Sequence, residues 1–257
     1  MERKPDKPQI YAGDIWKRFG ITEHYGGYFA TEELIKRCGI WPLQDILIIG
    51  CGTGYTPVLL AKEYNDFVMA TDIDPRMLEL TRERIIKEGV GAKVKTQLAD
   101  VQNLPFKDNT YNVVLAESVL VFTDPLQSAR EMLRVLKPGG VFGVNEVTVV
   151  GSPPAKSIES LTQFYPSKVQ ILSENEWRHL FEEAGFDEVT SIVHKLNYWK
   201  QLLSHLKIDG PRKYLASVYH MIADSDLRSI FFNKGLLWDT ISLMSYMSYG
   251  LYTGKKP

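Results

Sequence analysis

The chain of 257 residues has an ordinary globular composition and is close to neutral. It contains 44% hydrophobic and 24% charged residues and carries a formal net charge of −1 at pH 7. This composition provides enough apolar material for a large core. It lacks the strong positive balance with which proteins bind phosphate backbones, so it argues against nucleic acid as a ligand.

Targeting and redox signals favour a cytoplasmic protein. The first residues, MERKPDKPQI, are charged from the second position and contain no apolar core, so they do not predict a secretory signal. No uninterrupted run approaches the roughly 20 apolar residues that span a bilayer. The two cysteines, Cys38 and Cys51, have a spacing typical of neither a disulfide framework nor a zinc site, and we predict no metal centre.

Residues 44–196 alternate short β-rich runs with amphipathic segments of helical length. This alternation predicts an α/β fold with a parallel sheet and helices on its faces. The expected strands are, in chain order, DILIIG, FVMATD, AKVKTQLAD, YNVVLAES and VFGVNEVTVV.

The expected helices carry explicit start and stop signals. Capping side chains precede several of them, three being followed by proline, whose missing N–H is harmless in the first helical turn. The predicted caps are Thr31, Thr56, Asp74, Asp124 and Ser173, the last in a capping box with Glu176. The predicted ends are Gly39, Gly89, the LKPGG segment and Gly185.

Two regions stand outside this regular pattern. We expect residues 1–40 to form a helical cap, residues 41–196 the Rossmann-like core, residues 197–243 a helical insertion, and residues 244–257 the last strand of the sheet. The insertion is rich in Trp, Tyr, Phe, Leu and Met. Such residues could cover a substrate, pack on a second subunit to form a homodimer, or fill the core.

The segment ILIIGCGTGY predicts a ligand loop. A buried strand runs directly into Gly50, Gly52 and Gly54, and glycines at a strand-to-helix turn let a ligand approach the backbone closely. A dinucleotide fingerprint would require glycine at the position of Tyr55. The spacing therefore disfavours a pyrophosphate cradle and a dinucleotide-dependent oxidoreductase.

Two acidic residues at strand ends favour an adenosine-type ligand. Asp72 ends the strand FVMATD, where a carboxylate can accept both hydroxyls of a ribose. Asp100 ends the next strand, where its carboxylate can accept from an adenine amine while the Val101 N–H donates to a ring nitrogen. Taken alone, Asp100 is more typical of an ordinary turn residue.

The segments ILIIGCGTG, ATDIDPRML, LADVQNLPFKDNTYNVVLAES and LKPGG, taken together, resemble the successive signatures of class I S-adenosylmethionine-dependent methyltransferases. The resemblance covers about residues 44–146 and is closest to the small-molecule group that includes quinone and sterol methylating enzymes. It implies a seven-stranded, mostly parallel sheet with an antiparallel last strand. It also implies S-adenosylmethionine as the cofactor and S-adenosylhomocysteine as the product.

The resemblance also implies roles for particular residues. The glycine loop, including Cys51, would surround the methionine part, Asp72 would bind the ribose, and Ile73 would contact the adenine. Asp100 and Val101 would lie on the adenine edge, and Ala116 and Glu117 would lie where the methionine end meets the substrate.

One position departs from the family pattern. The family usually has an acidic residue two positions before the first glycine, and this chain has Ile48 there. That acid helps to organise the loop and to hold the ammonium group of the ligand. We therefore expect either weaker cofactor binding or compensation by another carboxylate.

The acceptor is expected to be a small, lipophilic molecule. ESVLVF follows the fourth strand in place of the Asn/Asp-Pro-Pro-aromatic loop of base and glutamine methylases, and two cysteines are too few to hold arsenic. The segments expected to cap the site are aromatic. His24 is the first candidate for a base, since an imidazole titrates near neutral pH, and Glu117 is the second.

Two alternatives remain open for these residues. A lone histidine is more often structural, Glu117 could serve to orient the ligand, and Tyr25, Tyr28 and Phe29 are expected to pack. A non-catalytic module that binds S-adenosylmethionine or S-adenosylhomocysteine is the main competing interpretation of the whole chain.

Overall fold

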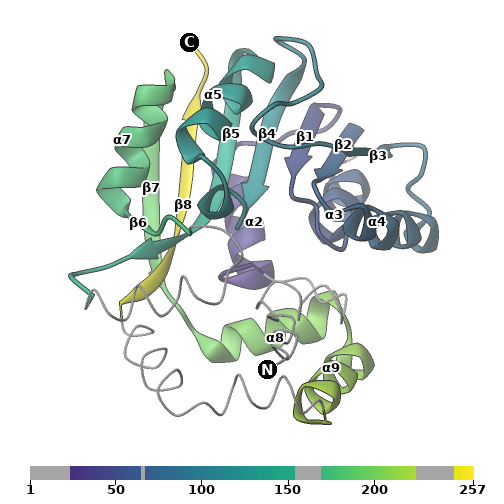
Figure 1. Ribbon diagram of the computed structural model, residues 1–257. Helices are drawn as coiled ribbons and strands as arrows, with labels where there is room; N and C mark the ends of the chain where they lie inside the picture. Colours follow the sequence, from purple (N-terminus) through teal and green to yellow (C-terminus); the bar gives the residue numbers. More distant parts are fainter. Residues whose placement is uncertain (1–23, 65–66, 154–168, 224–245) are drawn as a thin grey trace, which may run out of the picture.

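The described strands form one mixed sheet in the order β3-β2-β1-β4-β5-β8-β7 (Figure 1). The computed structural model describes residues 24–64, 67–153, 169–223 and 246–257. The strands are β1 (Asp45–Ile49), β2 (Phe67–Asp72), β3 (Val94–Leu98), β4 (Tyr111–Glu117), β5 (Leu136–Val149), β7 (Asp187–Lys195) and β8 (Met247–Lys255). β8 runs antiparallel to both β5 and β7, which confirms the predicted sheet and its antiparallel last strand. A short strand, β6 (Leu172–Ser173), adds a parallel pairing to β5.

Helices cover both faces of the sheet, and each face has its own hydrophobic cluster. On one face lie α2 (Gly27–Arg37), α3 (Tyr55–Glu63) and α4 (Pro75–Glu88), which pack with side chains such as Ile48 and Leu115. On the other face lie α5 (Pro125–Val135) and α7 (Glu174–Ala184), which pack with Phe142 and Val144. Because side chains alternate along each strand, successive residues of a central strand face the cluster under α2, α3 and α4 or the cluster under α5 and α7.

Most predicted helix ends are confirmed. The Asp74 carboxylate accepts from the Arg76 N–H at 2.9 Å, and the Asp124 carboxylate accepts from two N–H groups of the first turn of α5. Ser173 and Glu176 form the capping box of α7, and Gly89 ends α4 in the left-handed conformation. Each such cap contributes about 1 kcal/mol to helix stability.

Two predicted caps are wrong, because glycines start both helices. α2 begins at Gly27 after Gly26 (φ 78°), so Thr31 lies inside the helix. A Cβ on Gly26 would lie 2.5 Å from Cζ of Tyr249, so only glycine fits this start. α3 begins at Tyr55 after Gly54, and Thr56 does not cap it. The two threonine hydroxyls are therefore available for other contacts.

Two helices of the aromatic insertion lie beyond the carboxyl ends of β1 and β4 (Figure 1). They are α8 (Tyr198–Ile208) and α9 (Pro211–Ala223). The charged segment at residues 1–10, the rest of the cap up to residue 23, and residues 224–243 of the predicted insertion lie outside the described residues. The proposed division into domains stays a prediction.

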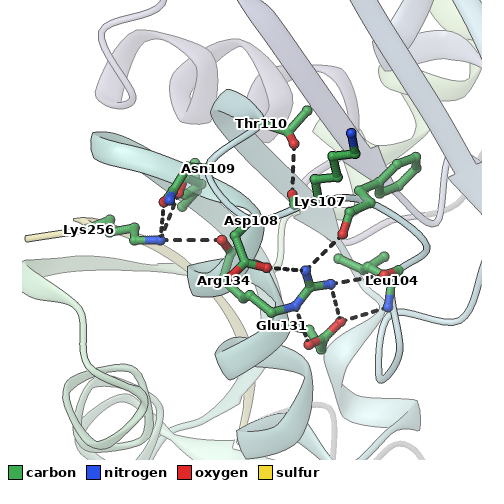
Figure 2. Close-up of polar contacts among 10 residues, drawn as sticks. Leu104, Lys107, Asp108, Asn109, Thr110, Glu131, Arg134 and Lys256 are labelled. Atoms are coloured by element: carbon green, nitrogen blue, oxygen red, sulfur yellow. Dashed lines mark hydrogen bonds and ion pairs between the residues drawn. The ribbon is translucent and has the colours of Figure 1, made fainter.

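Figure 2 shows a polar cluster around Arg134, which we call the Arg134 cluster. Asp108 and Arg134 come shortly before β4 and β5 in the chain, so the cluster lies at the amino ends of these strands. The guanidinium donates to both carboxylate oxygens of Glu131, to Asp108, and to the backbone carbonyls of Leu104 and Phe106. Near it, the Lys256 ammonium donates to the Leu136 carbonyl at 2.9 Å. The cluster ties α5 to the loop before β4 and to the chain end after β8.

Within the described residues, no helix combines the length and the apolar character needed to cross a membrane. Cys38 and Cys51 are both free and buried.

Candidate functional site

The carboxyl ends of three central strands bring polar groups together. β1 pairs Ile49 with Ala116 of β4, so the next residues, Gly50 and Glu117, lie side by side. β4 in turn pairs Glu117 with Asn145 of β5. Ligands of open α/β sheets bind at this edge.

The glycine loop is open where a ligand would lie and tightly packed where the turn after β4 approaches it. A Cβ on Gly50 would lie 2.3 Å from Cγ2 of Val119, so only glycine allows the turn after β4 to pack against this loop. Gly52 has φ 52°, and no described heavy atom lies within 4 Å of the position that its Cβ would take. The first turn of α3 also has no side-chain cap. The loop is therefore a cradle with exposed backbone.

α4 fixes the far side of the glycine loop through Thr81. The Thr81 hydroxyl donates to the Gly52 carbonyl at 2.9 Å, and Sγ of Cys51 lies 3.4 Å from the Thr81 hydroxyl oxygen. Burial raises the pKa of the Cys51 thiol to about 12, so the group stays protonated. The side chain of Cys51 thus has a packing role, and its backbone is the part that a ligand could contact.

Asp72 lies at the end of β2 beside the loop, as predicted. Its carboxylate accepts from the N–H groups of Gly52 and Asp74, each at 3.0 Å. A carboxylate offers about four lone-pair sites, so these bonds are compatible with further hydroxyl donors. The next residue, Ile73, is 68% exposed, and it presents an apolar surface beside a polar edge.

Asp100 and Val101 follow β3. The Asp100 carboxylate accepts from the Gln102 N–H at 2.9 Å, the hydrogen bond of an Asx turn. The side chain of Val101 is buried in the cluster under α5 and α7. Asp100 therefore stabilises a turn at the edge of the site, which is the alternative that the sequence left open, and an additional contact with a ligand stays a prediction.

His24, Glu117, Thr31 and Thr56 form one hydrogen-bonded network. The hydroxyls of Thr31 and Thr56 donate to the two oxygens of Glu117 at 2.8 and 2.7 Å. Nε2 of His24 lies 2.8 Å from the Thr31 oxygen and 3.5 Å from Glu117. We call these residues the Glu117 cluster. The cluster brings together both base candidates, His24 and Glu117, and the two threonines that had been predicted as helix caps.

The network fixes the tautomer of His24. A threonine hydroxyl has one proton, and Thr31 uses it for the carboxylate, which can only accept. Nε2 of His24 must therefore donate to Thr31, and in the neutral ring Nδ1 carries the lone pair. Nothing in the sequence indicated this orientation.

Three polar atoms at this edge are buried without a partner in the described part of the chain. They are Ser118 Oγ, Asn145 Oδ1 and Glu146 Oε2. Buried polar atoms normally have partners, so such a group marks a place where a ligand or water contributes. None of the three was predicted, although two adjacent polar residues in the apolar run VFGVNEVTVV were a visible signal. The side chain of Ala116 faces the side of the sheet opposite to Glu117 and Asn145, where it packs in an apolar cluster.

Glu146 holds the sharp turn that follows Glu117. Its Oε1 accepts from the N–H groups of Val119 and Leu120 at 2.7 and 2.6 Å, at the start of the short 3₁₀ helix η1 (Leu120–Phe122). Ser118, in this turn, has φ 56°, which is uncommon outside glycine. Burial raises the pKa of Glu146 to about 8, against the opposing effect of the backbone donors.

α8 closes the site from outside the sheet. The Gln201 amide donates to the His24 carbonyl at 3.0 Å. Arg84 of α4 donates to Thr53 of the glycine loop at 3.4 Å and to Asp209, just after α8, at 3.2 Å. The insertion is thereby linked to both the cap and the loop.

A small pocket opens beside these groups. Its lining is Tyr25, Ser118, Val121, Phe122, Val147, Val169, Ile171 and Met247. Most of these side chains are apolar, while Ser118 supplies a hydroxyl.

Comparisons with known proteins decide the family. A family described as "Methyltransferase domain" matches residues 47–144. The uncharacterized methyltransferase YodH of Bacillus subtilis is 32% identical, over 68% of this chain and 73% of its own length. The chain belongs to the class I S-adenosylmethionine-dependent methyltransferases. A ubiquinone/menaquinone biosynthesis C-methyltransferase, UbiE of Ectopseudomonas mendocina, is 34% identical over 68% of this chain and 72% of its own length.

Two further matches show how much of a relative's length the chain spans and which solved structure has a similar fold. An uncharacterized protein of Haemophilus influenzae is 29% identical, and the chain spans 66% of its length. A phosphoethanolamine N-methyltransferase of Haemonchus contortus, solved with S-adenosyl-L-methionine, has a TM-score of 0.74 at 19% identity, over 95% of this chain and 56% of its own. That likeness concerns the fold. The matches to YodH and UbiE identify the protein as an S-adenosylmethionine-dependent methyltransferase, which contradicts the interpretation as a dinucleotide-dependent oxidoreductase.

The residues present fit S-adenosylmethionine. The open space at Gly52 accommodates a ligand against the backbone, and Ile73 offers an exposed apolar face next to the Asp72 carboxylate. Asn145 Oδ1 provides a buried acceptor at the same edge. An uncapped helix start, an apolar face and buried acceptors match a ligand that has anionic, aromatic and cationic parts.

Proposed function

We propose that this methyltransferase acts on a small acceptor with an apolar body. The observation that carries this proposal is the pocket between η1, β5 and β8, whose lining is mostly apolar and includes the Ser118 hydroxyl. The pocket lies one residue beyond Glu117 along the chain, at the edge where the cofactor cradle ends. An apolar lining favours burial of a hydrocarbon part of the acceptor.

The cofactor site in this proposal comprises residues at the carboxyl ends of four strands, β1 to β4. The glycine loop (Gly50, Cys51, Gly52 and Gly54) surrounds the methionine part through its backbone, and Asp72 accepts from the ribose hydroxyls. Ile73 packs on the adenine, Asp100 and Val101 bind its edge, and Ala116 contributes backbone at the methionine end. When bound, S-adenosylmethionine supplies an electrophilic methyl group on sulfur.

His24 serves as the base for an acceptor that carries a proton. Its Nε2 donates to Thr31, so the lone pair of neutral His24 is on Nδ1, the atom that would take the proton. The Gln201 amide holds the backbone at His24. An acceptor whose nucleophile carries no proton would require positioning alone.

Transfer of label from methyl-labelled S-adenosylmethionine tests the proposal. The protein is incubated with the labelled cofactor and a cell extract, and we expect protein-dependent label in an organic-extractable product. His24→Ala should reduce turnover and keep the affinity for S-adenosylhomocysteine. His179→Ala, on the exposed face of α7, is the matched control and should leave both unchanged.

Absence of any labelled product across extracts would support the non-catalytic binding module instead. Label that partitions entirely into water-soluble products would contradict the apolar acceptor. Equal turnover in His24→Ala would leave His24 as a structural residue.

Asp72→Ala tests the cofactor site separately. Loss of a buried acceptor should weaken binding of S-adenosylhomocysteine by about 1 to 3 kcal/mol. Calorimetric titration measures this, and an unchanged affinity would refute the ribose assignment.

The helical insertion remains our proposed dimer surface, and the cytoplasm our proposed location. Exposed apolar side chains on α8 and α9 support the first proposal, namely Trp199, Leu203, Leu215 and Tyr219. The free thiols of Cys38 and Cys51 suit a reducing compartment. Light scattering after size exclusion should give the mass of a dimer, and a monomer mass would contradict this surface.

A further inference from the structure

We propose that Glu117 binds the ammonium group of the cofactor's methionine part, in place of the acid that the chain lacks at Ile48. This inference rests on the proposed binding of S-adenosylmethionine at the glycine loop. It assigns Glu117 to cofactor binding and leaves His24 as the base.

Glu117 and Ile48 belong to the same face of the sheet. Ile48 packs in the cluster under α2 and α3 together with Val113 and Leu115 of β4. Because side chains alternate along a strand, Glu117 lies on the same face as Val113 and Leu115. Its contacts with Thr31 of α2 and Thr56 of α3 confirm this.

The register carries the Glu117 carboxylate to the glycine loop. β1 pairs Ile48 with Leu115, and Glu117 follows two residues later, beside Gly50. A two-residue step along a strand covers about 6.6 Å. Glu117 of β4 therefore supplies a carboxylate on the face where an acid at position 48 of β1 would have supplied one. Its carboxylate lies two residues further toward the carboxyl end of the strands, where the ligand would bind.

Glu117 and Asn145 together offer the hydrogen-bond acceptors that an ammonium group requires. Two threonine donors occupy part of the roughly four lone-pair sites of a carboxylate. Directly across in the register, Asn145 Oδ1 is a second acceptor, buried and without a partner among the described residues. The Asn145 amide nitrogen donates to the Tyr25 carbonyl at 2.8 Å, which fixes the orientation of the oxygen.

The electrostatic balance also favours a cationic ligand. The side chain of Glu117 is 9% exposed, and His24 is the nearby basic group. In the described part of the chain, neither lysine nor arginine comes within 4.0 Å of this carboxylate. A largely buried carboxylate without a fixed cation gains from a charged donor that a ligand brings.

Calorimetric titration with a pair of ligands tests the assignment. The probes are S-adenosylhomocysteine and its analogue in which hydrogen replaces the amino group. In the wild-type protein we expect the amino group to strengthen binding by about 10- to 100-fold, the range of a hydrogen bond to a charged group. In Glu117→Gln the two ligands should bind about equally, with the affinity for the analogue unchanged.

Three further variants control the test. Glu79→Gln removes an exposed carboxylate on α4 and should keep the wild-type difference between the ligands. Ile48→Asp combined with Glu117→Gln should restore part of that difference, provided that its unfolding curve matches that of the single variant. Asn145→Leu should reduce the difference less than Glu117→Gln does.

The outcomes separate this proposal from the proposed function. If Glu117→Gln weakens both ligands equally, or neither, the ammonium assignment is wrong. An unchanged affinity for S-adenosylhomocysteine with a raised KM for the acceptor would overturn it in favour of acceptor binding. If the wild-type protein binds neither ligand, the cofactor site itself is refuted, whatever the role of Glu117.

Discussion

Two polar clusters lie at opposite ends of the central strands of the sheet. The Arg134 cluster lies at the amino ends of β4 and β5, and its guanidinium is surrounded by carboxylates and carbonyls (Figure 2). The Glu117 cluster lies at the carboxyl ends of the same strands, beside Ser118 Oγ and Asn145 Oδ1, which have no partner among the described residues. The first network satisfies its polar groups with protein atoms, whereas the second lies beside two polar atoms that have no protein partner among the described residues.

The difference separates stability from binding. A network whose donors and acceptors are matched within the chain lowers the free energy of the folded protein without any ligand. A network with open acceptors costs stability in the ligand-free protein and recovers it when a ligand supplies donors. We therefore expect substitutions in the Arg134 cluster to act on unfolding and those in the Glu117 cluster to act on affinity.

Arg134→Met should produce the largest loss of stability. The substitution keeps the aliphatic part and leaves Glu131 and the carbonyls of Leu104 and Phe106 without their donor. We expect a loss of about 3 kcal/mol in the free energy of unfolding, measured in urea. Arg130 is on the same helix as Arg134 and forms an exposed ion pair with Glu183 of α7. Arg130→Met should change the free energy of unfolding by less than about 0.5 kcal/mol. Similar losses in both variants would contradict the distinction.

Glu146→Gln should change the pH dependence of stability. The pKa of Glu146 is raised from 4.5 to about 8 in the folded protein. Between these values the folded state keeps a proton that the unfolded state has lost, so the contribution of Glu146 to stability is full below the lower value and falls as pH rises through the upper one.

We expect this fall to amount to about 2 kcal/mol between about pH 5.5 and about pH 7.5 in the wild-type protein, since one pKa unit corresponds to ~1.4 kcal/mol. Glu146→Gln should abolish that part of the slope, because glutamine accepts from Val119 and Leu120 without titrating. Urea unfolding at several pH values measures it. Identical slopes in the two proteins would show that Glu146 is ionised when folded.

Thr31→Val should have the smallest effect on stability, about 1 kcal/mol. It removes the hydroxyl that links His24 to Glu117 and keeps the shape of the side chain. Turnover should fall because His24 loses the partner that fixes its tautomer, while the affinity for S-adenosylhomocysteine changes by less than it does in Glu117→Gln. Thr110→Val, beside the Arg134 cluster, is the control and should leave turnover unchanged. Wild-type turnover in Thr31→Val would separate His24 from the network.

Local signals in the sequence predicted most of the fold. Strand β2 and the caps at Asp74, Asp124 and Ser173 were predictable because an apolar run or a capping side chain acts on its own neighbours. β7 was not among the strands expected from residue pattern, because its inner residues are only partly buried and it depends on pairing with β8.

The candidate site was predictable to the extent that it lies in motifs. Asp72 and the glycine loop lie where the sequence predicted, at the ends of adjacent parallel strands. The roles of Thr31 and Thr56 were not predictable, because threonine near a helix start is a typical cap and their actual partner, Glu117, is distant along the chain. Ile48 showed that an acid was missing, but only the register of β1 and β4 shows which carboxylate lies on the same face.

Thermal unfolding of the wild-type protein and two variants, with and without S-adenosylhomocysteine, tests the different roles of the two clusters. We predict that Arg134→Met lowers the Tm of the ligand-free protein and keeps the upward shift caused by the ligand. Glu117→Gln should keep a ligand-free Tm close to that of the wild-type protein and lose most of the shift. The reverse pattern, with the ligand shift lost in Arg134→Met and retained in Glu117→Gln, would contradict a structural role for the Arg134 cluster and a binding role for the Glu117 cluster.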